Sequence, residues 1–81
     1  MPFTPEQTAS LLAQQGIGNT ILQRLRQMGL DDVALLAAAD VDTVLQQGAA
    51  ITHSSCWRNS PQARAAIQTA IAWATQQRIT P

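Results

Sequence analysis

Gly16-Ile17-Gly18 is the stretch that decides the fold of this 81-residue chain. It separates two helix-forming runs, Thr4 to Gln15 and Asn19 to Met28. Glycine at position 16 allows the positive φ that ends a helix, and glycine at position 18 leaves nearby backbone N–H groups uncovered by a side chain. Ile17, the apolar residue between them, is expected to point inward. The pattern therefore predicts a tight hairpin between two helices.

The start of the second helix is a candidate anion site. The first N–H groups of a helix have no acceptor within it, and the helix dipole places partial positive charge there. Asn19 and Thr20 head this helix, with Asn19 as the expected cap, and Arg24 follows about a turn and a half later. A phosphate is the typical ligand of such a site.

The spacing Leu11-x4-Gly16-Ile17-Gly18-x3-Leu22-x2-Leu25 resembles the helix-hairpin-helix motif, and Gly29 to Asp40 resembles the connector of its tandem versions. The resemblance covers residues 4–45 well and extends to the related sterile-alpha-motif-like (SAM-like) folds. It implies a grip on a DNA phosphate through the hairpin backbone, without reading base sequence. A second hairpin would fall at residues 48–59, where no second Gly-x-Gly occurs, so the second half is expected to be degenerate.

Capping signals predict a single all-α domain, a compact SAM-like bundle of about five short helices. Its expected parts are a helix-hairpin-helix at residues 4–28, two connector helices at 31–47, an irregular loop at 48–59 and a long C-terminal helix at 60–77. The predicted helices cover residues 5–15, 19–28, 32–39, 41–47 and 61–77. The expected N-terminal caps are Thr4 for the first, Asp31 for the third, Asp40 for the fourth and Ser60 for the fifth. Gly29 is expected to close the second helix, and Gly48 is expected to end the fourth.

Composition limits the chemistry. Five arginines balance five acidic residues, so at best a local basic patch can face nucleic acid. His53 and Cys56 supply two ligands where a zinc site uses about three or four, which indicates no metal site, and no cofactor or enzymatic activity is predicted. No apolar run approaches the roughly 20 residues of a membrane span, and we expect a cytoplasmic protein.

Two functions remain open. The first is a non-enzymatic module that binds the DNA phosphate backbone weakly and needs a partner or self-association to be useful. The second is a protein-interaction domain with an apolar surface around Trp57, Trp73 and the C-terminal helix, although core packing is the more usual role of both tryptophans. Arginines converging on the hairpin would favour DNA, and an apolar patch around a tryptophan would favour a protein. The candidate nucleic-acid residues are Gly16, Ile17, Gly18, Asn19, Thr20, Arg24, Arg58 and Arg64.

Overall fold

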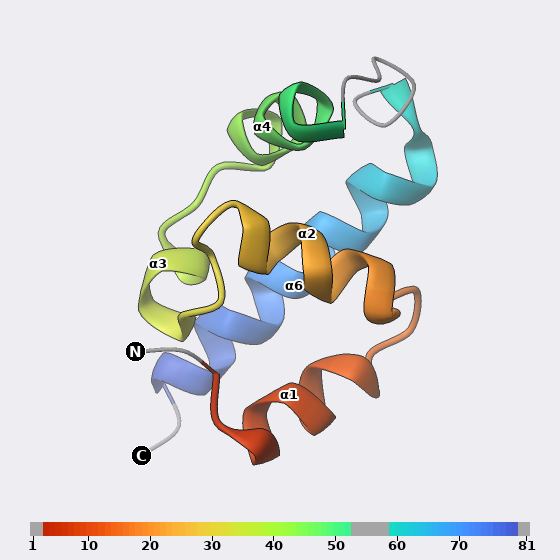
Figure 1. The fold of residues 1–81 in the computed structure, drawn as a ribbon. Helices are drawn as coiled ribbons and strands as arrows, with labels where there is room; N and C mark the ends of the chain where they lie inside the picture. The colour runs from red at the N-terminus through yellow and green to blue at the C-terminus, as the bar shows by residue number, and fades with distance from the viewer. Residues whose placement is uncertain (1–2, 53–58, 80–81) are drawn as a thin grey trace.

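The computed structural model describes residues 3–52 and 59–79, which contain five helices and no strand (Figure 1). The all-α prediction is confirmed. The radius of gyration is 11.7 Å, about the value expected of a compact chain of this length. The helices are α1 (Pro5–Leu12), α2 (Asn19–Gln27), α3 (Val33–Ala37), α4 (Val41–Thr52) and α6 (Pro61–Ile79).

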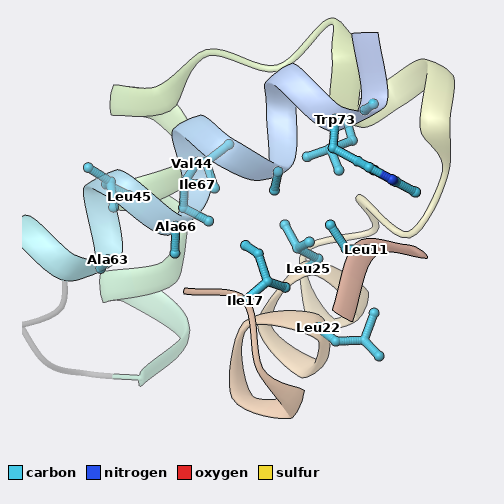
Figure 2. Packing of buried hydrophobic residues seen from close by; sticks show 13 residues of the cluster. Leu11, Ile17, Leu22, Leu25, Val44, Leu45, Ala63, Ala66, Ile67 and Trp73 are labelled. Carbon is cyan, nitrogen blue, oxygen red and sulfur yellow. The ribbon is translucent and has the colours of Figure 1, made fainter. Parts of the chain in front are cut away.

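The long helix α6 is the element around which the others pack. It contacts α3 and α4 along one side, while α1 and α2 lie along the other (Figure 1). Small side chains on its inner face, Ala66, Ala70 and Ala74, allow close approach of the neighbouring helices. Figure 2 shows Ile17 and Leu25 pointing toward this face. The buried core comprises Leu11, Ile17, Leu22, Leu25, Leu36, Val44, Leu45, Ala63, Ala66, Ile67, Ala70, Trp73 and Ala74.

The turn between α1 and α2 differs in one respect from the prediction. Gly16 has the expected positive φ of 84°, but α1 ends at Leu12 instead of Gln15. Residues 14–17 form a separate turn in which the Gln14 carbonyl accepts from the Ile17 N–H at 3.1 Å. Gly16 therefore serves the third position of a four-residue turn, where a positive φ is required, and does not cap the helix directly.

At the junction between α2 and α3, the predicted end of α2 is confirmed, whereas the predicted cap of α3 is not. Gly29 has φ 72°, its N–H donates to the Arg26 carbonyl, and the Leu30 N–H donates to the Leu25 carbonyl at 2.8 Å, the pattern of a Schellman motif. The cap of α3 is Asp32, so the prediction of Asp31 was wrong by one residue. The reason is that the Asp32 carboxylate accepts from the Ala34 N–H at 2.8 Å and the Leu35 N–H at 3.3 Å.

Helix α4 begins as predicted and continues further. Asp40 caps it by accepting from the Thr43 N–H at 3.2 Å. Gly48, expected to end the helix, is buried within it, and α4 runs on to Thr52. Glycine costs only about 1 kcal/mol in a helix interior, which tertiary packing can offset. The predicted loop at 48–59 is thus helical over 48–52, and its residues 53–58 lie outside the described part. α6 extends two residues beyond its predicted end.

A pair of glycine substitutions tests the turn. Gly16→Ala is expected to lower the free energy of unfolding by about 1–2 kcal/mol, because a residue with a β-carbon is strained at the positive φ of 84°, even though the space around Gly16 is open. Gly18 has φ −122° and ψ −175°, an extended conformation open to any residue, and a β-carbon there would meet nothing within 4 Å. Gly18→Ser is therefore the matched control, expected to change stability by only a few tenths of a kcal/mol. Urea denaturation measures both, and equal losses would contradict this account of the turn.

Candidate anion site at the start of α2

The hairpin presents its backbone outward because Ile17 anchors it from the inside. Ile17 is 6% exposed and belongs to the core, which confirms the inward orientation predicted for it (Figure 2). The residues on either side of it, Gly16, Gly18, Asn19 and Thr20, are all exposed. The apolar anchor therefore fixes the turn while leaving the start of α2 open to a ligand.

Four backbone donors at this point have no acceptor among the described residues. The Ile17 N–H is used by the turn, and the first bond of α2 runs from the Leu22 N–H to the Gly18 carbonyl at 3.1 Å. No side chain caps the helix either. The N–H groups of residues 18–21 are thus the orphan donors expected at a helix start. With the positive end of the helix dipole, they form a place where an anion is stabilised.

This open start distinguishes α2 from the other described helices. α1 has a full capping box, in which the Thr4 hydroxyl accepts from the Gln7 N–H at 3.1 Å and the Gln7 side chain accepts in return from the Thr4 N–H at 3.0 Å. The hydroxyl of Ser60 accepts from the Ala63 N–H at 3.3 Å in α6. Carboxylates cap α3 and α4, as described above. The expectation that Asn19 caps α2 was wrong, because Asn19 is already helical and the cap position belongs to Gly18.

The two candidate arginines that the structure describes, Arg24 and Arg64, each have a partner elsewhere in the fold. Arg24 donates from Nη1 to the Oε1 atom of Gln27 at 2.9 Å, one turn toward the C-terminal end of α2, and its Nε is buried without a partner. Arg64 pairs with Asp42, with 2.7 Å between Nη2 and Oδ1. Arg58 lies outside the described residues. Within the described ranges, then, the candidate site consists of backbone donors supported by polar side chains.

The Asp42–Arg64 pair links α4 to α6 but contributes little to stability. Both side chains are well exposed, at 68% and 47%, so solvent screens their attraction. Asp42→Asn is expected to lower the free energy of unfolding by less than about 1 kcal/mol, measured by urea denaturation in low salt. A larger loss that persists in high salt would mean that Asp42 acts through packing or hydrogen bonding and not through charge.

A groove borders the hairpin on the side facing α6. Its volume is about 610 Å³, and a smaller hollow of about 280 Å³ adjoins it, sharing Gly16, Gln62 and Ala66. The described residues that line the two are uncharged. This groove could not be predicted from local sequence patterns, because its walls come from segments some 50 positions apart. The larger groove is lined by Gln14, Gln15, Gly16, Gln62, Ala65, Ala66 and Thr69, and the smaller by Gly16, Ile21, Ser60, Gln62, Ala63 and Ala66.

Of the two tryptophans, the structure describes Trp73 and not Trp57. Trp73 is 5% exposed, its ring lies edge-on to Phe3 with 5.5 Å between centroids, and its Nε1 donates to the Ser10 hydroxyl at 3.0 Å. It therefore packs in the core and offers no ring face to a partner. Trp57, with the neighbouring His53 and Cys56, lies outside the described residues.

In the described ranges, no cluster of three or more His, Cys, Asp or Glu side chains could hold a metal ion. No described helix is both long and apolar enough to cross a membrane. Comparison of the chain with known protein families, with curated proteins and with solved structures finds no match.

Proposed function

We propose that this domain is a non-enzymatic module that binds the phosphate backbone of DNA through the N–H groups at the start of α2. The observation that carries the proposal is the open, exposed start of this helix in a chain whose other described helices are capped by side chains. Backbone N–H groups without an acceptor cost free energy when they are buried. The residues at the start of α2 are largely exposed, so their four N–H groups are available to an external acceptor.

The geometry suggests how a phosphate is held. Its oxygens accept from the backbone donors of residues 18–21, with the Thr20 hydroxyl and the Asn19 carboxamide as further donors. Gly18, which has no side chain, lets a sugar–phosphate chain approach the backbone closely. Backbone contacts carry no information about base sequence, so binding is non-specific. This arrangement also supports assignment to the helix-hairpin-helix family, as part of the same proposal.

Affinity is expected to be low. The two candidate arginines that the structure describes, Arg24 and Arg64, are engaged with Gln27 and Asp42. A single phosphate contact gives a slope of only about −0.9 in a plot of log K against log salt concentration. A useful module therefore needs a second domain, a partner or self-association to add contacts.

DNA as ligand and the single cysteine both fit a cytoplasmic location.

An amide NMR titration with a short DNA duplex tests this proposal. At low salt, we expect chemical-shift changes centred on residues 17–21, and we expect them to fade as salt is raised because phosphate binding releases counterions. The amides of α4, which has its own cap, serve as the internal reference. Unchanged amides at residues 17–21 in a folded protein would contradict the proposal.

The alternative function, protein interaction, has less support in the described residues. Trp73 is buried, and the large apolar side chains that the described part exposes are Leu35 on α3 and Ile51 on α4. Single exposed apolar residues are common on protein surfaces and do not by themselves indicate an interface. A pull-down in which Trp57→Ala is compared with the unchanged protein tests this alternative directly.

A further inference from the structure

The groove between the α1–α2 turn and α6 opens directly beside the backbone donors of α2. Gly16 lines the groove and lies two residues before Gly18, where those donors begin. A ligand that places an anionic group at the start of α2 can therefore extend a neutral group into the groove. Because the described lining residues are uncharged, the groove favours an uncharged, polar group over a second phosphate.

Carboxamides give the groove its chemistry. Gln14 is partly engaged, since its Nε2 donates to the Ser10 carbonyl at 3.2 Å. Gln15 and Gln62 are exposed and form no side-chain hydrogen bond with the described residues. Each carboxamide offers a donor and an acceptor side by side, which is the pattern that matches the edge of a nucleobase. Ala65 and Ala66 contribute apolar lining to the same groove.

We propose that this groove accepts an unpaired nucleobase from the nucleotide whose phosphate is bound at the start of α2. The proposal rests on the proposed function, since it needs the phosphate to be held there. In a duplex, the Watson–Crick edges are paired and turned into the stack, so a base can reach the groove only from a single strand, a gap or a flipped position. The domain accordingly prefers unpaired DNA to duplex DNA.

The type of recognition follows from the lining. No aromatic side chain of the described part borders the groove, so stacking, the usual source of affinity for single strands, does not contribute there. Hydrogen bonds from Gln15 and Gln62 are the main attraction. Because a carboxamide can present its donor and its acceptor in either order, every base finds a partner, and selectivity among bases is low.

The test compares three probes of equal length by fluorescence anisotropy: a single-stranded oligonucleotide, its duplex, and a single strand of abasic sites. We expect the intact single strand to bind at least about fivefold more tightly than the other two, the effect of one good contact to a base edge. Gln62→Ala should reduce this preference, and the double change with Gln15→Ala should remove it. Gln68→Ala, an exposed glutamine on α6 that does not line the groove, is the matched control and should leave it intact.

The possible outcomes separate this proposal from the one on which it rests. Equal affinity for all three probes, with shifts still centred on residues 17–21, would overturn the nucleobase groove and leave the phosphate site standing. Absence of binding to every probe would overturn both. Shifts of the groove amides caused by an uncharged peptide, and by none of the DNA probes, would also overturn it and assign the groove to a protein partner.

Discussion

Trp73→Ala is expected to lower the free energy of unfolding by about 3–5 kcal/mol. The side chain is 5% exposed, lies edge-on to Phe3 and donates to Ser10, so its removal leaves a cavity where α1 and α6 meet. A domain of this length is stable by only about 4–12 kcal/mol, so the change takes a large share of the total. Urea denaturation followed by circular dichroism measures the loss.

Trp73→Phe is the matched comparison for this change. Phenylalanine retains most of the packing against Phe3 and loses the hydrogen bond to Ser10, so we expect a loss of about 1–2 kcal/mol. An alanine variant as stable as the phenylalanine variant would show that the ring does not hold α1 against α6.

Gly18→Asp is expected to weaken DNA binding at least tenfold without loss of stability. The extended backbone at Gly18 and the open space around it suit an aspartate at the cap position. Its carboxylate would accept from the donors of α2 and interact well with the helix dipole, raising stability by a few tenths to about 1 kcal/mol. The same carboxylate would occupy those donors and repel a phosphate. Opposite changes in stability and affinity are the signature of a binding site.

Two further variants isolate the cause of this effect. Gln47→Glu adds the same charge at an exposed position of α4 and should reduce binding only slightly. Gly18→Ser can cap α2 without adding charge and should fall between the unchanged protein and the aspartate variant. Fluorescence anisotropy with a labelled oligonucleotide compares all of them. Full affinity in Gly18→Asp would show that the donors of α2 do not hold DNA.

The features that could be predicted from the sequence are those fixed by neighbouring residues. Thr4 and Ser60, each followed by proline, place the starts of α1 and α6 correctly, because a cap and its acceptors lie within three positions. The inward orientation of Ile17 follows from its being the apolar residue of an otherwise polar turn. Gly48 was misinterpreted because its place in α4 depends on tertiary packing, which no local pattern reports.

The candidate site could be predicted only in its backbone part. Donors at a helix start follow from the hairpin pattern itself. The ion pair of Arg64 could not be predicted from the hairpin pattern, since its partner Asp42 lies 22 residues away and meets it only in the folded chain. Local sequence also could not decide between Asp31 and Asp32 as the cap of α3, because both are aspartates and aspartate is a preferred residue at that position. The glutamine-lined groove exists only once α6 has docked beside the turn.

The contact between Ser10 and Trp73 has a consequence for the order of folding. It joins residues 63 positions apart, so most of the chain must be closed into a loop before the bond can form. The local turns of α2 and α3 bear no such entropic cost and can form early. Docking of α1 is therefore expected to follow the rate-limiting barrier, so that loosening this contact speeds unfolding and leaves the folding rate almost unchanged.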